Sequence, residues 1–322
     1  MVQDAWGRHI DYIRLSLTEA CNFCCPYCRP TEITTDTQLE LLSVYEWMVI
    51  IEAFHLLGVR AIRLTGGEPL LYPYVHELLE RIYKTGWFED ISMTTNGSLL
   101  SHEAHRLRKL GLNRVNISLD SLDADIFASC VGKQNQLSNV LSGIEAALSA
   151  EFDVVKINTV LTRQWTDDEI LDVLSYVKKW KIVWRAIEYM PFQHKKFDGP
   201  TFMEWKSQIE RLVGAPLVEV ETVKGFGPAS YYQLPNEIII GFIFAMSHRY
   251  CKHCNRVRLT SDGYLRLCLL HDDESNLINL VRNGMKSNEL ADHIKNVLQL
   301  KKEAHDGKSI VQPARPMWKI GG

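Results

Sequence analysis

Eight cysteines occur in this chain of 322 residues, and four of them lie within eight residues near the N-terminus. Cys21, Cys25 and Cys28 give the spacing C-x3-C-x2-C. Soft thiolate ligands select iron–sulfur clusters or zinc, so three thiolates on one short loop can hold three irons of a 4Fe–4S cluster. The fourth iron would then be open to another ligand. On spacing alone, a zinc site or a redox-active thiol pair explains this loop equally well.

A second cysteine triplet lies near the C-terminus. Cys251, Cys254 and Cys268 give the spacing C-x2-C-x13-C. A structural zinc would need a fourth ligand, which His248 or His253 could supply. Two triplets that both lack a fourth cysteine at a fitting spacing favour two clusters, each with one open iron.

Several basic residues indicate an anionic ligand. Arg256 and Arg258 alternate just after the second triplet, so an extended segment would turn both to one side. Arg14, Arg63 and Lys156 lie in or near short apolar runs that we interpret as strands. Solvated rim residues are the commoner explanation for arginine, but basic side chains inside a barrel are unfavourable unless an anion meets them. Together these five residues predict a polyanion such as a triphosphate.

The elements that must position these residues follow a simple alternation. Between residues 12 and 189, short apolar runs alternate with longer amphipathic ones, which indicates strands alternating with helices. The predicted strands are 12–17, 61–65, 91–95, 115–119, 154–161 and 183–189. The predicted helices are 44–58, 75–85, 101–110, 139–150 and 166–179. Such alternation predicts an α/β fold with a parallel sheet and outer helices, and six units make a partial rather than a closed barrel.

Chemistry in such folds occurs at the carboxyl ends of the strands. The first cysteine triplet, Gly66-Gly67-Glu68-Pro69 and Thr94-Thr95-Asn96-Gly97 each follow or end a predicted strand. The glycines after the second strand would let the backbone approach a ligand closely. These motifs should therefore meet at one end of the barrel.

The composition changes after Met190, which suggests two domains. Residues 1–190 would form the partial barrel with the first cluster. Residues 191–322 would form a region with the second cluster that covers the open side of the barrel. There we expect helices at 202–212 and 288–301 and a strand at 237–246.

Charge and hydropathy exclude some function classes. A net charge of −3 gives no basis for binding nucleic acid or a membrane surface by charge. We recognise neither a secretory signal nor an apolar run long enough to span a bilayer. We therefore expect a cytoplasmic protein, in which cysteine clusters bind metals rather than form disulfides.

With these motifs collected, the chain resembles radical S-adenosylmethionine (SAM) enzymes and, among them, the GTP 3′,8-cyclase family of molybdenum cofactor biosynthesis. The cysteine triplet at 21–28 marks only the superfamily. More specific are the Cys-x2-Cys-Asn-Arg-x-Arg-Leu-Thr motif at 251–260 and the terminal Gly-Gly. The remaining matches are Leu-Thr-Gly-Gly-Glu-Pro at 64–69, Thr-Thr-Asn-Gly at 94–97, Ile-Glu-Tyr-Met-Pro at 187–191 and Met-Ser-His at 246–248. The resemblance implies a radical SAM barrel.

The resemblance also implies a role for each matched position. The first 4Fe–4S cluster would be held by Cys21, Cys25 and Cys28, and the second by Cys251, Cys254 and Cys268. Positions matching SAM contacts are Tyr27, Gly67, Ser118 and Met190. Positions matching GTP contacts are Arg14, Arg63, Thr94, Lys156, Arg256, Val257 and Arg258. Catalytic roles would fall to Arg256, Arg258 and a C-terminal tail, Gly321-Gly322, that reaches into the site.

The implied reaction begins with cleavage of SAM to methionine and a 5′-deoxyadenosyl radical. That radical would take hydrogen from C3′ of GTP. The resulting C3′ radical would attack C8 of guanine, and reduction would give (8S)-3′,8-cyclo-7,8-dihydroguanosine 5′-triphosphate. The implied partners are GTP, an external electron donor and cyclic pyranopterin monophosphate synthase, which would receive the product. The protein would be a monomer or homodimer.

Some positions depart from the family pattern. Ala20 stands where the family usually has arginine, Tyr72 and Pro73 stand where it usually has basic residues, and Cys24 is an extra thiol. These departures leave a paralogous radical SAM enzyme with another substrate, such as a peptide, as the alternative. A zinc-stabilised binding protein is the non-enzymatic alternative. We expect Cys24 to point away from the first cluster and Cys130 to pack as a small hydrophobic residue.

Overall fold

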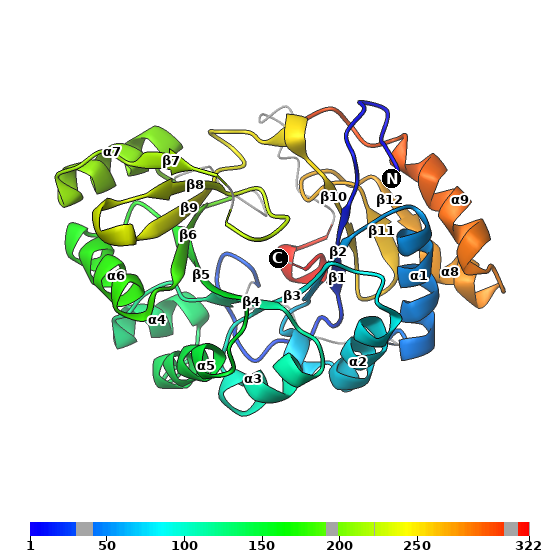
Figure 1. Cartoon of the computed structure of the whole chain (residues 1–322), viewed down its shortest axis with the longest axis horizontal. Coiled ribbons are helices and arrows are strands. Elements are labelled where there is room, and N and C mark those ends of the chain that lie inside the picture. Colours follow the sequence, from blue (N-terminus) through cyan, green and yellow to red (C-terminus); the bar gives the residue numbers. More distant parts are fainter. Residues whose placement is uncertain (30–40, 191–198, 222, 306–314, 322) are drawn as a thin grey trace.

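Six parallel strands form the centre of one curved sheet. The computed structural model describes residues 1–29, 41–190, 199–221, 223–305 and 315–321. The central strands are β1 (Tyr12–Ser16), β2 (Ala61–Thr65), β3 (Asp90–Thr95), β4 (Arg114–Ser118), β5 (Val154–Leu161) and β6 (Val183–Glu188). They lie side by side in sequence order and curve around an interior that holds the C-terminal end of the chain (Figure 1). The predicted partial barrel of the α/β class is thereby confirmed.

Helices cover the outer face of this sheet (Figure 1). They are α1 (Val44–Leu56), α2 (Val75–Thr85), α3 (Leu100–Lys109), α4 (Ala124–Val131), α5 (Leu137–Ser149) and α6 (Asp167–Trp180). Capping residues set where they begin: Ser43 and Glu46 form a capping box at α1, as do Thr166 and Glu169 at α6. Gly86, with φ of 65°, ends α2 in the left-handed conformation that glycine favours. The apolar faces of the helices pack on the sheet in one hydrophobic core.

The C-terminal part of the chain extends the same sheet at both ends. The strands next to β6 are β9 (Ile239–Ile243), β8 (Ser230–Gln233) and β7 (Val218–Val220). The strands next to β1 are β10 (Arg256–Leu259), β11 (Tyr264–Arg266) and β12 (Glu274–Asn276). The first strand of each set runs parallel to its barrel neighbour, and the others are antiparallel. The remaining helices are α7 (Phe202–Val213), α8 (Leu277–Arg282) and α9 (Ser287–Leu298).

The structure corrects the predicted elements at several places. The strand predicted at 237–246 covers only Ile239–Ile243, because the 3-10 turn Pro235–Glu237 precedes it. Helices α4 and α8 and the five strands β7, β8, β10, β11 and β12 were not predicted as elements. These strands have three or four residues each, which is too short for a period of two to be recognised.

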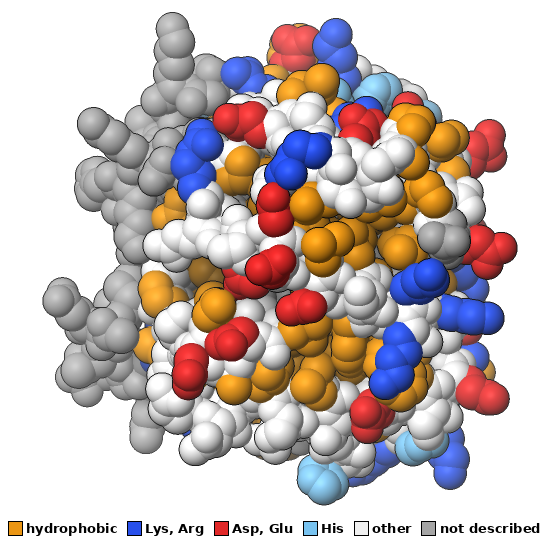
Figure 2. All heavy atoms as spheres, turned by 90° about the vertical axis from the view of Figure 1, so that its left-hand side faces the viewer, with side chains coloured by type: hydrophobic (Ala, Val, Ile, Leu, Met, Phe, Trp, Pro, Cys, Tyr) orange, Lys and Arg blue, Asp and Glu red, His pale blue; other side chains and the backbone are white. Residues whose placement is uncertain are grey.

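One face of the molecule carries side chains of both charges. Figure 2 shows the side of the molecule that carries α6, α7 and β7, where acidic and basic side chains are interspersed with apolar ones. Leu171, Met203 and Val218 are exposed apolar residues on these three elements. Within the described ranges, no helix combines the length and apolar character needed to cross a bilayer.

Candidate active site

The first cysteine triplet lies at the carboxyl end of β1 and opens onto a cavity with an empty volume of about 1120 Å3. The cavity is also bounded by residues at the carboxyl ends of β2 to β6 and by the end of the chain. Its walls include Cys21, Cys25, Tyr27, Cys28, Gly67, Thr94, Ser118, Met190 and Gly321. The structure thus brings together the three predicted ligands of the first cluster, all four predicted SAM positions, one predicted GTP position and one tail glycine.

Hydrogen bonds hold the cysteine loop against the strand ends. Tyr27 Oη donates to Asp120 Oδ2 at 2.7 Å, and Asp120 Oδ1 accepts from the Val160 backbone N–H at 2.8 Å. Asn96 Nδ2 donates to Asn22 Oδ1 at 2.8 Å. Asp120 is buried, which raises the pKa of its carboxyl group. Asp120 was not among the predicted site residues, although it lies two residues after the end of β4, where functional residues of such folds occur.

The glycines after β2 are required by the cysteine loop itself. A Cβ atom at Gly67 would collide with the carbonyl oxygen of Ala20 and lie 2.7 Å from that of Glu19. The backbone N–H of Gly67 donates to Thr18 at 2.7 Å, and that of Glu68 donates to Ala20 at 2.7 Å. The sequence predicted a close approach of this backbone to a ligand. The structure shows a close approach to the segment that enters the cysteine loop.

Glu68 connects this turn to the end of β3. Its buried carboxylate accepts hydrogen bonds from Thr95 Oγ1 and the Asn96 backbone N–H, both at 2.7 Å, and from the Leu70 backbone N–H at 3.1 Å. Burial raises the pKa of Glu68 to about 7, although these three donors favour the ionised form.

The cysteine loop supplies thiol donors, which are the ligands that iron–sulfur clusters take. All three cysteines are free thiols. In the described ranges, no three His, Cys, Asp or Glu side chains are grouped so that they could surround one metal ion. Zinc requires its sulfur ligands at about 2.3 Å from a common centre, whereas a cluster binds each thiolate through a different iron. Burial raises the pKa of Cys28 to about 12, so its thiolate form needs a cation beside it.

The second triplet lines a separate cavity, with an empty volume of about 530 Å3. Its walls include Tyr250, Cys251, Cys254, Arg256, Val257, Arg258, Cys268, Leu270 and His305. Neither His248 nor His253, the histidines considered as zinc ligands, lies in this wall; both line a neighbouring cavity. His305 is the histidine at the second triplet, where its Nε2 lies 2.9 Å from the Ala245 carbonyl oxygen.

Two basic side chains fix the loop that carries the second triplet. Arg8 Nη1 donates to the carbonyl oxygen of Cys251 at 2.9 Å. Lys301 is buried and donates to the carbonyl oxygens of Arg256, at 3.2 Å, and of Leu267. Although burial opposes it, Lys301 and Arg256 lower the pKa of Cys254. Neither Arg8 nor Lys301 was singled out from the sequence, because their partners are backbone carbonyls far away in the chain.

Strand register places the predicted GTP-contacting arginines in a row. Arg14 of β1 is aligned with Arg63 of β2 on one side and with Arg258 of β10 on the other. Aligned residues on neighbouring strands turn their side chains to the same face of the sheet. Lys156 lies two strands beyond β3 and is 1% exposed. The alternation rule applied to the sequence therefore identified one basic face.

Two further arginines of this interior were missed. Arg185 of β6 is buried, and its Nε donates to Asn158 Oδ1 at 2.8 Å. Arg114 of β4 is also buried and is paired with Asp90 through two hydrogen bonds. Arg185 occupied an alternate position in the strand predicted at 183–189, so its location could have been predicted.

The hydrogen-bond acceptors of Lys156 are neutral. Lys156 Nζ donates to Tyr231 Oη at 2.7 Å and to the Lys224 carbonyl oxygen at 3.1 Å. Burial, followed by the guanidinium groups of Arg185 and Arg114, lowers the pKa of Lys156 to about 6. Burial also lowers the pKa of Arg63 and Arg258 to about 10.

Other predicted GTP positions have unsatisfied polar atoms. Among the described residues, Thr94 Oγ1 and Arg256 Nε are buried without a hydrogen-bond partner. Such groups are rare unless an unseen ligand or water completes them. Val257 differs, because its side chain packs in the hydrophobic core and is aligned with Ile13. A contact from Val257 would therefore come from its backbone.

The C-terminal tail reaches the row of arginines. The carbonyl oxygen of Gly321 accepts from Arg258 Nη1 at 2.9 Å and from Arg14 Nη2 at 3.0 Å. Gly321 has φ of 71°, and a Cβ atom there would collide with Thr65 Oγ1. Gly322, the other predicted tail residue, lies outside the described residues.

The departures from the family pattern lie away from these contacts. The buried Tyr72 hydroxyl donates to the Leu42 carbonyl oxygen at 2.7 Å, in the core. Cys24 is not part of the cavity wall and lies against Gly132 instead. Ala20 is exposed, and its carbonyl oxygen is taken by the Glu68 N–H.

Comparison with known proteins agrees with this geometry. The family model for the radical SAM superfamily matches residues 15–177, and the model described as Molybdenum Cofactor Synthesis C matches residues 182–307. The GTP 3′,8-cyclase of Thermodesulfovibrio yellowstonii is 38% identical over 327 residues, covering 100% of both chains. That of Nostoc punctiforme is 39% identical and covers 97% of this chain and 99% of its own.

Solved structures share the fold at low sequence identity. SuiB of Streptococcus suis, bound to its precursor peptide SuiA, gives a TM-score of 0.63 at 14% identity, over 90% of this chain and 65% of that chain. The structure of anSMEcpe with bound AdoMet gives a TM-score of 0.58 at 16% identity, over 92% of this chain and 84% of that chain. The full-length sequence matches, rather than these folds, decide the assignment. The chain belongs to the GTP 3′,8-cyclase family of the radical SAM superfamily.

Proposed function

We propose that this protein converts GTP into (8S)-3′,8-cyclo-7,8-dihydroguanosine 5′-triphosphate, the first step of molybdenum cofactor biosynthesis. The observation that carries the proposal is the row of Arg258, Arg14 and Arg63 beside a cysteine-lined cavity in a chain whose full-length relatives are GTP 3′,8-cyclases. Membership of the radical SAM superfamily implies a 4Fe–4S cluster and SAM. When bound, this pair supplies a 5′-deoxyadenosyl radical that can take the C3′ hydrogen of GTP.

The first cavity suits the binding of SAM and the cluster. In our proposal, Cys21, Cys25 and Cys28 hold the cluster. SAM contacts would come from Tyr27, Gly67, Ser118 and Met190. Apolar side chains of Phe23, Phe127 and Val131 line part of the same cavity and would keep water from a reactive radical.

The buried basic residues suit a triphosphate. Arg63, Lys156 and Arg185 lie inside the barrel with neutral hydrogen-bond acceptors beside them. A triphosphate would supply negative charge to these three residues, and guanidinium groups bind phosphate oxygens in pairs. Arg14 and Arg256 complete the proposed set, with Thr94 and the Val257 backbone as polar contacts. The result would be a fixed orientation of the ribose toward the SAM cavity.

The second cluster is also part of the proposal. Cys251, Cys254 and Cys268 would hold it, and its open iron would take the guanine of GTP. Their shared cavity and the nearby Arg256 and Arg258 support this role. Arg258 touches both the tail carbonyl and the second cavity, so it would couple the tail to the substrate. Catalytic roles are proposed for Arg256, Arg258 and the tail glycines.

Further parts of the proposal concern organisation and partners. The division into residues 1–190 and 191–322 remains a prediction, since one sheet runs through both ranges. We propose an external electron donor and transfer of the product to cyclic pyranopterin monophosphate synthase. A cytoplasmic location and a monomeric or homodimeric state are likewise predictions.

The test is anaerobic incubation of the reconstituted protein with SAM, a reductant and GTP deuterated at C3′. We expect release of 5′-deoxyadenosine that depends on GTP and carries the deuterium, together with the cyclised triphosphate in the mass spectrum. Arg258→Ala should abolish cyclisation, whereas Arg211→Ala, on the outer helix α7, should not. Cleavage of SAM at one rate with and without GTP would overturn the proposal and favour another substrate, such as a peptide.

A further inference from the structure

The C-terminal tail is held by side chains from two distant parts of the chain. Gly321 meets Arg14 and Arg258 inside the barrel. Two residues earlier, Lys319 Nζ lies 3.4 Å from Glu19 Oε2, just before the first cysteine loop. None of these contacts explains how the outer end of the tail is fixed, and Arg315 is the residue found there.

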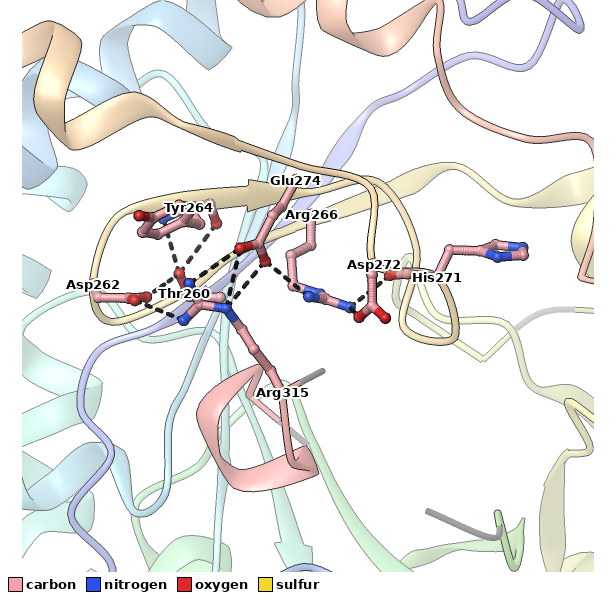
Figure 3. Close-up of polar contacts among 8 residues, drawn as sticks. All are labelled: Thr260, Asp262, Tyr264, Arg266, His271, Asp272, Glu274 and Arg315. Carbon is pink, nitrogen blue, oxygen red and sulfur yellow. Dashed lines mark hydrogen bonds and ion pairs between the residues drawn. The ribbon is translucent and has the colours of Figure 1, made fainter. Parts of the chain in front are cut away.

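Arg315 is bound by two carboxylates and one aromatic ring (Figure 3). Its Nη1 donates to Asp262 Oδ2 at 2.6 Å. On its other edge, Nε donates to Glu274 Oε2 at 3.0 Å and Nη2 to Glu274 Oε1 at 3.2 Å. The guanidinium carbon lies 4.5 Å from the centre of the Tyr264 ring. The side chain is only 18% exposed, so these charged contacts are partly shielded from solvent.

The two carboxylates are themselves immobilised. Asp262 Oδ1 accepts from Thr260 Oγ1 at 2.5 Å, and Glu274 Oε2 accepts from Arg266 Nη1 at 2.9 Å. Arg266 also donates to Asp272 Oδ1 at 3.1 Å and is 1% exposed (Figure 3). Asp262 lies on the turn after β10, and Glu274 lies on β12. Strand β11 pairs with both β10 and β12. Because β10 also carries Arg258, the outer anchor of the tail and its inner contact belong to one rigid unit.

A short and rigid stretch joins Arg315 to Gly321. The backbone forms the 3-10 turn Met317–Lys319, closed by hydrogen bonds from Lys319 N–H to Pro316 and from Ile320 N–H to Met317, at 3.0 and 3.1 Å. Trp318 and Ile320 are buried at 3% and 1% exposure. A displacement at Arg315 should therefore reach Gly321 rather than be absorbed on the way.

We propose that Arg315 is a positioning residue that latches the tail to Asp262 and Glu274 and so keeps the Gly321 carbonyl between Arg14 and Arg258. Arg315 itself touches neither proposed cavity. The inference rests on the proposed function of the tail in GTP cyclisation, but the latch itself can be tested without that reaction.

The first test measures the latch directly by hydrogen exchange on the anaerobically reconstituted protein. Arg315→Met removes the charge and keeps much of the side-chain length. We expect amide exchange of the peptide containing residues 315–321 to become roughly tenfold faster, as local opening becomes easier. The matched control is Arg211→Met, which removes a bidentate ion pair with Asp167 on the outside of the barrel and should leave this peptide unchanged. Unchanged exchange in Arg315→Met would overturn the latch.

The second test separates positioning from general stability. Arg315→Met should lower kcat for cyclised product by about tenfold and leave KM for GTP within about twofold, because the strands keep the GTP-contacting side chains in place while the Gly321 carbonyl moves. Arg315→Lys should recover part of kcat, since lysine can reach one carboxylate as a point charge. A rise in KM without a change in kcat, or equal losses in the lysine and methionine variants, would contradict the proposal. Iron content equal to that of the wild type verifies that both proteins are folded.

Non-additivity gives the final check. If Arg315 acts through Gly321, Arg315→Met should lower activity far less in a Gly321→Ala protein than in the wild type. Full additivity would show that Arg315 acts by another route. If the wild-type protein does not consume GTP at all, the proposed function fails, whereas the exchange result still decides the latch.

Discussion

At the scale of single residues, Gly321 is constrained in two independent ways. Its φ of 71° lies in the left-handed region, and the place of a side chain is already taken by Thr65 Oγ1. The first constraint concerns the backbone alone, but the second arises from β2, one of the three strands across which the row of Arg258, Arg14 and Arg63 runs. A change at this residue therefore acts on the site through the position of the tail.

We expect Gly321→Ala to displace the tail carbonyl from Arg14 and Arg258 and to lower cyclised product by about a hundredfold, the loss typical of a misplacement near 1 Å. SAM binding should be retained. Gly214→Ala is the matched control, because Gly214 has φ of 70° but no atom within 4 Å of its Cβ position. That variant should lose about 1 kcal/mol of stability and keep its activity. Equal kinetics in the two variants would show that the tail is not needed.

The residues that the sequence could reveal were those governed by local rules. Alternation along a strand was sufficient to place Arg14, Arg63 and Lys156 on one face. Arg8 and Lys301 could not be found this way, because they act on carbonyl groups that only folding brings near. The same limit applies to Arg315, whose partners lie 41 and 53 positions away in the chain.

At the scale of elements, the first cysteine loop has no regular structure of its own and depends on the strand ends around it. Tyr27 and Asp120 form the link to β4 and β5, and Asn22 and Asn96 form the link to β3. The loop can present three thiolates to a cluster only while these strands hold it in one shape.

Asp120→Ala should therefore loosen the first cluster. It removes the acceptor of Tyr27 and of the Val160 N–H, and we expect an iron chelator to remove this cluster's iron about tenfold faster, as for other outer-shell partners of metal ligands. The measurement is made in a protein in which the three cysteines of the second triplet are replaced by serine, so that only the first site contributes iron. Asp167→Ala, on an exposed helix start, is the control. If Asp120→Ala released iron at the same rate as Asp167→Ala, Asp120 would not stabilise the first cluster.

Among the strands, those of five or more residues were predicted and those of three or four were not. The helix 75–85 and the strand 154–161 have the predicted bounds, because each is long enough to show its period. The pairing of β10 with β1 joins residues about 244 positions apart, and no local pattern encodes it. The sequence nevertheless predicted that Arg256 and Arg258 face one side, since extended backbone alone requires that.

At the scale of the whole molecule, the barrel interior carries positive charge while the chain as a whole is slightly acidic. Burial and the neighbouring arginines lower the pKa of Lys156 from 10.5 to about 6. Unfolding thus takes up a proton between these pH values, so the Lys156 contribution to stability rises with pH across that window. A bound anion would raise this pKa again, because opposite charge favours the ammonium form.

Inorganic tripolyphosphate should therefore raise the Tm of the protein by a few degrees, through binding to the folded state alone. The Tm increase should be larger in the wild type than in Lys156→Met, and this difference should be larger at pH 6 than at pH 9. Above pH 6, anion binding requires Lys156 to take up a proton. The charge of tripolyphosphate changes with pH in the same way for both proteins. The difference between their Tm shifts at each pH therefore reports the contribution of Lys156. A difference between them that does not vary with pH would contradict the role of Lys156.

The sheet that runs from β12 to β7 joins the region of the second cysteine triplet to the barrel that carries the first. The segment after residue 199 pairs with β6 through β9 and with β1 through β10, so it closes both outer strands of the parallel core. A barrel alone would present two unpaired strand edges, each a template for joining another copy edge to edge. The region that bears the second triplet thus also covers both edges of the parallel core. Truncation of the region after residue 199 should therefore impair solubility before it impairs chemistry.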